Sequence, residues 1–180
     1  MASKKKETGP TIEVEISGET LVLKSPDQKV WDRYISHRRR GELSAGRREL
    51  VACCTTSHEG GEVLELLKKK PALPKKIADA LEDLAGAGAD YDIGDDSATC
   101  TADDGTEITI RAPSLEEWEA LESDEIAPAD FSVKVREAIT KLCTEPAAGA
   151  FERFPALPIV LLDAAAQLAG AGVQVVVKKG

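Results

Sequence analysis

The chain has 180 residues, of which 42% are hydrophobic, 31% are charged and only 4% are aromatic. This is the composition of a globular protein and not of a disordered polyampholyte. The 32 acidic and 23 basic residues give a net charge of −9, which argues against a general nucleic-acid-binding function because phosphate binding needs a cationic face. No apolar run reaches the roughly 20 residues that a membrane span requires.

The first ten residues, MASKKKETGP, contain no apolar segment after the lysines, so the sequence predicts no secretory signal. The chain has four cysteines, too few for a disulfide scaffold, and without export we expect them to be reduced thiols. We therefore expect a soluble, cytoplasmic protein without a membrane or nucleic-acid partner. Charge is uneven along the chain, with a net charge of +1 in residues 1–90 and −10 in residues 91–180.

An internal repeat is the strongest signal in the sequence. Residues 18–26 resemble residues 105–113 at a shift of 87, which also carries Trp31 onto Trp118, and these are the only two tryptophans. At a shift of 84, the Pro-Ala-Leu-Pro segment of residues 71–74 recurs identically. At a shift of 89, four residues find partners: Arg47, Leu50, Cys54 and Thr55 fall on Arg136, Ile139, Cys143 and Thr144. This period is longer than that of solenoid repeats, so it indicates a duplicated small domain.

The duplication predicts the domain organisation. We expect one copy over residues 11–88, a second over residues 98–172, and a solvated linker over residues 89–97. Residues 1–10 are expected to be disordered. The alternating valines of the last segment, residues 173–180, predict a further strand and a short tail.

Each copy is predicted to open with a β-hairpin. Apolar and polar residues alternate over residues 12–16 and 21–23, with a turn at Ser17 and Gly18. In the second copy the strands cover residues 98–102 and 108–110, and Asp104-Gly105 is typical of a two-residue hairpin turn.

Short helices follow each hairpin. Pro26 and Pro113 are predicted in the first turn of a helix, with Ser25 as one cap and Ser114 with Glu117 as a capping box. Apolar positions with helical spacing then predict two or three more helices in each copy, the last ending at Gly86 or Gly170. The fold class is therefore α+β: two tandem copies of a small unit, each a β-hairpin followed by three or four short helices.

Few residues suggest chemistry. Cys54 and His58 are four residues apart and would share a face of a continuous helix, as a thiol nucleophile with its base or as half of a zinc site. A buried cysteine at a helix end and a surface histidine are the favoured interpretation, and the second copy keeps Cys143 but not the histidine. No third catalytic group and no four-ligand zinc set is apparent. We therefore predict no catalytic residues, no metal and no cofactor.

An acidic stretch over residues 90–104 contains six aspartates. It lacks the alternating ligands, central glycine and closing glutamate of a calcium-binding loop. A solvated linker is the simpler interpretation.

The best candidates for partner binding are basic and aromatic. Arg38, Arg39 and Arg40, with the lysines of residues 68–70 and 75–76, make the first copy locally basic. Such a run either compensates helix C-termini or forms a docking patch for an acidic partner or for the acidic second copy. Trp31 and Trp118 are core anchors of their copies, or interface residues if their helix faces are exposed.

With these features, each copy resembles a small module found among the tail assembly chaperones of long-tailed phages. The resemblance covers nearly the whole chain as a pattern of helix starts and apolar positions, although the tandem arrangement departs from the usual single module. In the first copy the matching segments are residues 24–26, 31–34, 48–53, 64–67 and 84–86. In the second copy they are residues 111–118, 139–143 and 168–170.

The resemblance implies a non-catalytic factor in the host cytoplasm that binds the helical tape-measure protein and recruits tail-tube subunits. A structural component of a phage tail or baseplate is the alternative, and a thiol hydrolase using Cys54 is a third hypothesis. Self-association is compatible with each of the binding hypotheses.

Overall fold

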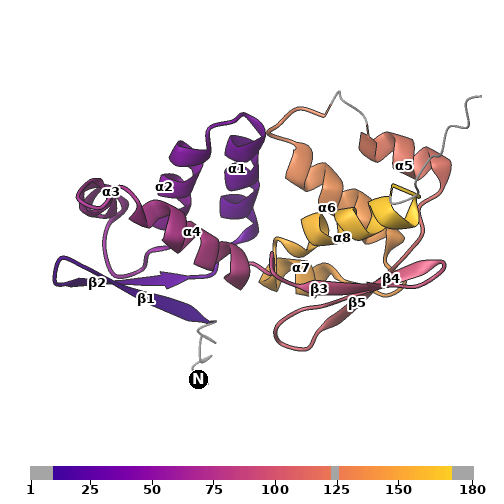
Figure 1. Cartoon of the computed structure of the whole chain (residues 1–180), viewed down its shortest axis with the longest axis horizontal. Helices are drawn as coiled ribbons and strands as arrows, with labels where there is room; N and C mark the ends of the chain where they lie inside the picture. The colour runs from indigo at the N-terminus through magenta and orange to yellow at the C-terminus, as the bar shows by residue number, and fades with distance from the viewer. Residues whose placement is uncertain (1–9, 123–125, 172–180) are drawn as a thin grey trace, which may run out of the picture.

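The chain folds into two small α+β units that follow one another along the sequence (Figure 1). The structure is a computed structural model that describes residues 10–122 and 126–171. Over these residues it contains eight helices and two antiparallel sheets. The α+β prediction and the two tandem copies of a hairpin followed by short helices are confirmed.

The first copy consists of one hairpin and four helices. The hairpin forms a two-stranded sheet on which the helices pack. Its elements are β1 (Thr11–Ile16), β2 (Glu19–Lys24), α1 (Gln28–Arg39), α2 (Leu43–Cys54), α3 (Gly60–Lys68) and α4 (Leu73–Leu84).

The second copy repeats this order with one additional strand. Its sheet has the order β3-β4-β5, with antiparallel pairing throughout. Its elements are β3 (Asp90–Ile93), β4 (Ser97–Thr101), β5 (Glu107–Arg111), α5 (Leu115–Glu122), α6 (Phe131–Leu142), α7 (Ala148–Arg153) and α8 (Leu157–Leu168).

Strand β3 corrects the prediction of a solvated linker over residues 89–97. Tyr91 pairs with Cys100 across the β3–β4 ladder, and its hydroxyl donates a hydrogen bond to the Asp163 carboxylate of α8. The segment is acidic, but its Tyr91 and Ile93 alternate with aspartates, and this pattern fits an edge strand with a solvated face. Residues 89–97 thus join the copies and also widen the second sheet.

The two hairpin turns differ in length. In the first, Ser17 and Gly18 have φ values of +54° and +87°, as a two-residue turn of the favoured hairpin type requires. In the second, the Ala102 amide donates to the Thr106 carbonyl oxygen at 2.9 Å, so three residues form the loop and Gly105 takes φ +81°. The two-residue turn predicted at Asp104-Gly105 is therefore wrong by one residue.

The first helix begins later than predicted. Asp27, not Ser25, caps α1, because its side chain accepts a hydrogen bond from the Val30 amide, and Pro26 precedes the cap. Ser25 instead donates to the Leu84 carbonyl oxygen at 3.3 Å. In the second copy Ser114 and Glu117 make both bonds of the predicted capping box.

The described helices correct the register of the repeat. Helix α2 and helix α6 both have 12 residues and start 88 positions apart, not 89. The residue that follows each helix bridges to the hairpin, Thr55 to Leu23 and Cys143 to Ile110. Cys143 therefore corresponds to Thr55, Arg136 to Arg48 and Phe131 to Leu43. Helices α1 and α5 start 87 positions apart, and α4 and α8 start 84 apart.

Each copy has its own apolar core. In the first, Trp31, Tyr34 and Leu50 pack with the hairpin residues Leu21 and Leu23. In the second, the hairpin and helices α6, α7 and α8 supply the core, with Phe151 as its large aromatic residue. As predicted, Gly86 and Gly170 end the last helices with φ values of +90° and +98°.

No helix among the described residues is long and apolar enough to cross a lipid bilayer. The predicted disorder of residues 1–10 falls, except for Pro10, outside the described part of the chain, as does the predicted strand and tail of residues 173–180.

The two tryptophans are expected to contribute unequally to stability. Trp31 is 2% exposed, whereas Trp118 is half-buried and belongs to neither core. We expect Trp31→Ala to lower the free energy of unfolding by about 3–5 kcal/mol. We expect Trp118→Ala to lower it by about 1 kcal/mol. Denaturant unfolding followed by circular dichroism measures both, and equal losses would contradict this assignment.

Candidate functional site

The two copies contact each other through helix α1 of the first and helix α6 of the second. The Arg136 guanidinium donates two hydrogen bonds to the Asp32 carboxylate, at 3.0 and 3.2 Å. Both side chains are only 18% exposed, so this paired geometry forms in a partly desolvated setting where it is stronger than at an open surface. The Arg39 guanidinium lies over the Phe131 ring, 4.2 Å from its centroid.

The ends of α4 and α8 complete this junction. The Ala156 amide donates to the Ala85 carbonyl oxygen at 2.9 Å, and Ala156 is buried in the core of the first copy. A Cβ atom placed on Gly86 would lie 3.1 Å from the Phe154 Cβ atom and 3.2 Å from the side chain of Leu157. Gly86 thus ends α4 and also lets the second copy approach closely.

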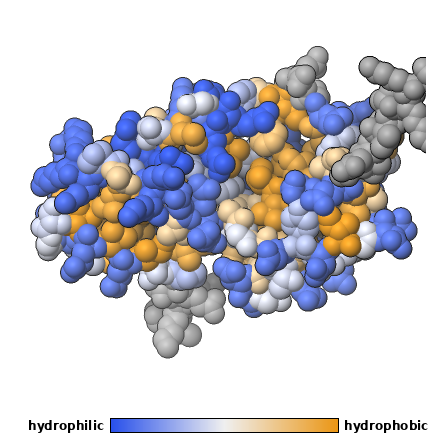
Figure 2. Space-filling view, viewed as in Figure 1, coloured by the Kyte–Doolittle hydropathy of each residue, from blue (hydrophilic) through white to orange (hydrophobic). Residues whose placement is uncertain are grey.

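A groove of about 390 Å³ lies at this junction. Its wall is mainly apolar, and the first copy contributes two arginines and one glutamate to it. The lining residues are Trp31, Ile35, Arg38, Arg39, Glu82 and Ala87 from the first copy and Phe131, Ala156, Ile159 and Val160 from the second. Figure 2 shows apolar side chains gathered over α6 and α8, beside the more hydrophilic surface of α1 and α2.

The three consecutive arginines have different contacts. The Arg38 guanidinium donates a hydrogen bond to the Glu82 carboxylate at 3.1 Å, and the same carboxylate accepts a hydrogen bond from the Tyr34 hydroxyl. Arg39 stacks on the second copy as described above. Arg40 turns back to its own helix and donates to the Ser36 hydroxyl at 2.9 Å. The structure therefore places Arg38 and Arg39 at the groove, while Arg40 lies outside its lining.

Tyr34, whose hydroxyl binds Glu82, belongs to the core of the first copy. Burial raises the pKa of Tyr34 to about 12, and the hydrogen bond to Glu82 acts in the same direction. The phenol therefore stays protonated and holds the Glu82 carboxylate in place between Tyr34 and Arg38.

The two candidate tryptophans lie in different places. Trp31 is buried and lines the groove, whereas Trp118 is half-buried on α5, at the far end of the second copy (Figure 1). Sequence reasoning missed the other groove residues, among them Phe131, Ile159 and Val160 of the second copy. The first copy has Lys75 and Lys76 where the second has Ile159 and Val160, and this difference between copies was the available signal.

Cys54 and His58 do not form the predicted pair. Helix α2 ends at Cys54, so the continuous helix that would align the two residues is absent. The Nδ1 atom of His58 lies 2.8 Å from the Ser57 hydroxyl, and its Nε2 atom lies 3.3 Å from Glu19. The histidine thus joins the loop after α2 to the hairpin.

Three of the four cysteines are buried or half-buried, in surroundings that disfavour the charged thiolate. Burial raises the pKa of the Cys54 thiol to about 12 and the pKa values of Cys100 and Cys143 to about 11. A thiol nucleophile needs the opposite shift, because the thiolate is the reactive form. This observation weighs against the thiol hydrolase hypothesis. Among residues 10–122 and 126–171, no group of three or more His, Cys, Asp or Glu side chains is placed to hold a metal ion.

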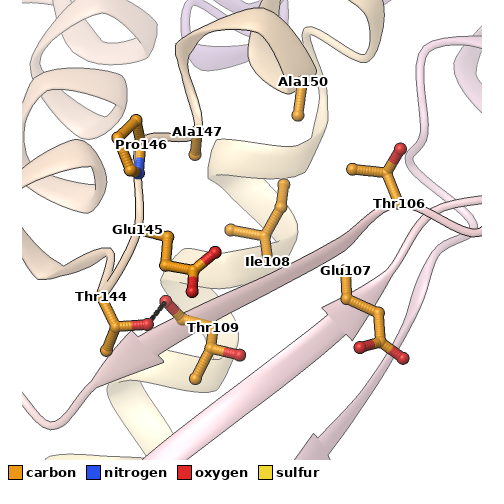
Figure 3. Close-up of a pocket in the computed structure, with 9 residues that line it drawn as sticks. All are labelled: Thr106, Glu107, Ile108, Thr109, Thr144, Glu145, Pro146, Ala147 and Ala150. Carbon is orange, nitrogen blue, oxygen red and sulfur yellow. Dashed lines mark hydrogen bonds between the residues drawn. The ribbon is translucent and has the colours of Figure 1, made fainter.

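A second hollow, of about 270 Å³, lies between β5 and the loop before α7 (Figure 3). The carboxylates of Glu107 and Glu145 stand on opposite sides of Ile108, and the Thr144 hydroxyl donates to the Thr109 carbonyl oxygen at 3.3 Å. In the first copy Ser57 takes the place of Glu145, and its hydroxyl accepts a hydrogen bond from the Val22 amide at 3.0 Å. Among the contacts of the described residues, this side-chain bridge to the hairpin occurs in the first copy only.

A search of protein-family models, of curated proteins and of solved structures finds no match to this chain. The junction and its groove, which combine arginine contacts between the copies with an apolar wall, are accordingly the candidate functional site on structural grounds.

The Asp32–Arg136 pair is expected to hold the copies together. A double-mutant cycle with Asp32→Asn and Arg136→Gln should give a coupling energy of about 1–3 kcal/mol, because each charge has lost much of its hydration. Urea unfolding of the four proteins measures this energy. A coupling near zero would show that the pair contributes no net stability to the junction.

Thiol reactivity should follow burial. At a pH of about 8, iodoacetamide should modify the exposed Cys53 in the native protein and leave Cys54 and Cys100 unmodified until denaturant is added. Peptide mass spectrometry detects the modification, and native labelling of Cys54 at the rate of Cys53 would contradict the assignment.

The same burial predicts a pH dependence of stability. Because the folded pKa values exceed the ordinary value of 9.0, the contribution of these thiols to the free energy of unfolding should persist below pH 9 and fall as the pH rises toward 11 and 12.

Proposed function

We propose that this protein is a non-catalytic adaptor that binds an amphipathic helix of a partner protein in the groove between its two copies. The observation that carries the proposal is the groove itself, whose apolar wall is formed jointly by both copies. Short helices that enclose an apolar groove are suited to bind the apolar face of a helix, with anchors at i, i+3, i+4 and i+7.

The charges at the groove select the kind of helix. Arg38 is 44% exposed and Arg39 is exposed, so the first copy presents cationic groups beside the apolar wall. A partner helix with acidic residues flanking its apolar stripe would satisfy both the wall and these arginines. Within the proposal, Trp31 forms the floor of the groove and stabilises it from inside the core.

We further propose that the partner is a tape-measure or tail-tube protein and that the chain acts as a phage or prophage tail assembly chaperone. The support is the resemblance stated above on helix starts and apolar positions, together with a groove suited to a long helical partner. Tandem copies would let one chain hold its partner in a single, fixed orientation, because the groove is built from unlike faces of the two copies.

Apolar groove residues should determine binding. We expect Ile159→Asp and Val160→Asp each to weaken binding to the tape-measure protein of the encoding phage at least about tenfold, because a charge would face the apolar stripe. Ile93→Asp is the matched control, since Ile93 is 41% exposed on β3 and lies outside the groove. Isothermal titration with the co-purified partner measures the affinities.

Thermal unfolding of the same variants separates binding from folding. Unchanged affinity in the groove variants, with the native melting temperature kept, would refute the groove as the binding site. Recovery of the chain from purified particles by mass spectrometry would instead favour a structural tail or baseplate component.

A further inference from the structure

The junction joins two unlike faces. Helix α1 of the first copy packs against α6, and α6 is the counterpart of α2, not of α1. From left to right in Figure 1 the helices follow in the order α2, α1, α6, α5, with both sheets along the lower edge. A contact of this head-to-tail kind is not self-limiting, because the counterparts of both faces remain at the two ends of the molecule.

The end of the second copy carries the counterpart of the α1 face. The side chain of Gln28 in α1 reaches the second copy. Its counterpart in α5 is Leu115, which is 74% exposed. Trp118 takes the place of Trp31 and is half-buried. Glu119 takes the place of Asp32, so the second copy keeps an acidic residue at this position of the junction ion pair.

The end of the first copy carries the counterpart of the α6 face. Arg48 takes the place of Arg136, so the basic partner is kept as well. Leu43 takes the place of Phe131 and is 41% exposed. Among the ion pairs formed by the described residues, neither Arg48 nor Glu119 takes part in one.

Burial differs between the junction and the two ends in a consistent way. Ala85 and Ala156 are buried and hydrogen-bonded to each other at the junction. Their counterparts at the ends, Ala169 and Ala72, are both exposed. Among the described residues, the two ends therefore present several of the same residue types as the junction, with most of these side chains exposed.

The two ends are also complementary in charge. Helix α5 contains four glutamates and no basic residue. The opposite end has lysines at residues 68–70, and it has Lys75 and Lys76 where the junction has Ile159 and Val160. An end-to-end contact would thus replace part of the apolar contact of the junction with attraction between acidic and basic groups.

We propose that the protein binds a second copy of itself head to tail, with α5 of one molecule against α2 and the start of α4 of the next. In this contact Glu119 pairs with Arg48 of the neighbour, and Leu115 and Leu43 become covered. Repetition of the contact extends the series of units beyond two. The proposal goes beyond the adaptor function above and does not depend on the identity of the partner.

Sedimentation velocity of the full chain over a concentration range from about 5 to about 500 μM tests the contact. The weight-average sedimentation coefficient should rise with concentration. Because the contact relies on exposed charges, raising the salt concentration from about 50 to about 500 mM should reduce the association. Glu119→Arg and Arg48→Glu should each weaken self-association about tenfold or more.

Mixing the two charge variants provides the decisive measurement. The arginine introduced by Glu119→Arg in one molecule would face the glutamate introduced by Arg48→Glu in the next, so an equimolar mixture should associate more strongly than either variant alone. Glu13→Arg, which makes the same change of charge on the exposed side of β1, is the matched control and should associate like the unchanged protein. A sedimentation coefficient independent of concentration, or association that the variants leave unchanged, or a mixture no stronger than its components, would overturn the proposal.

Discussion

The enclosure of α1 between α2 and α6 is the contact on which the rest of the structure depends. Helix α1 contacts both of these helices, and the contact with α6 brings Asp32 and Arg136 together in a partly desolvated pair. A unit of this size buries little apolar surface by itself, so a covalently attached second copy adds stability that an isolated copy lacks. The groove, the cation–π contact of Arg39 and the close approach at Gly86 all follow from this one arrangement.

The functions proposed here depend on the differences between the copies as much as on their similarity. Ile159 and Val160 make the groove wall apolar, while Lys75 and Lys76 make the corresponding surface of the first copy basic. The same backbone therefore presents an apolar site at the junction and a charged surface at the end. Joining unlike faces also orients the molecule, since one end of it is acidic and the other basic.

Local features of the sequence were predicted well because their causes are local. The capping box of Ser114 and Glu117 and the left-handed glycines after α4 and α8 each depend on a few neighbouring residues. Two local details were wrong by a residue or two, namely the Ser25 cap and the Asp104-Gly105 turn. The larger errors concern competition over a longer range. Residues 90–93 are acidic enough for a linker, yet pairing with β4 makes them a strand. The match of Cys54 and Thr55 to a second Cys-Thr pair suggested a shift of 89, whereas the bridges from Thr55 and Cys143 to the hairpins set it at 88.

The amino-acid sequence by itself determined that the protein is duplicated, that each copy is a hairpin followed by short helices, and which residues form most of the two cores. These properties follow from periodicity, turn residues and repeated composition, which a linear pattern records. Only the tertiary structure decided which faces of the copies meet, and with them the roles of Arg38, Arg39 and Arg136. That decision depends on the fit of surfaces far apart in sequence, such as the end of α4 and the start of α8, where the Ala156 amide donates to the Ala85 carbonyl oxygen.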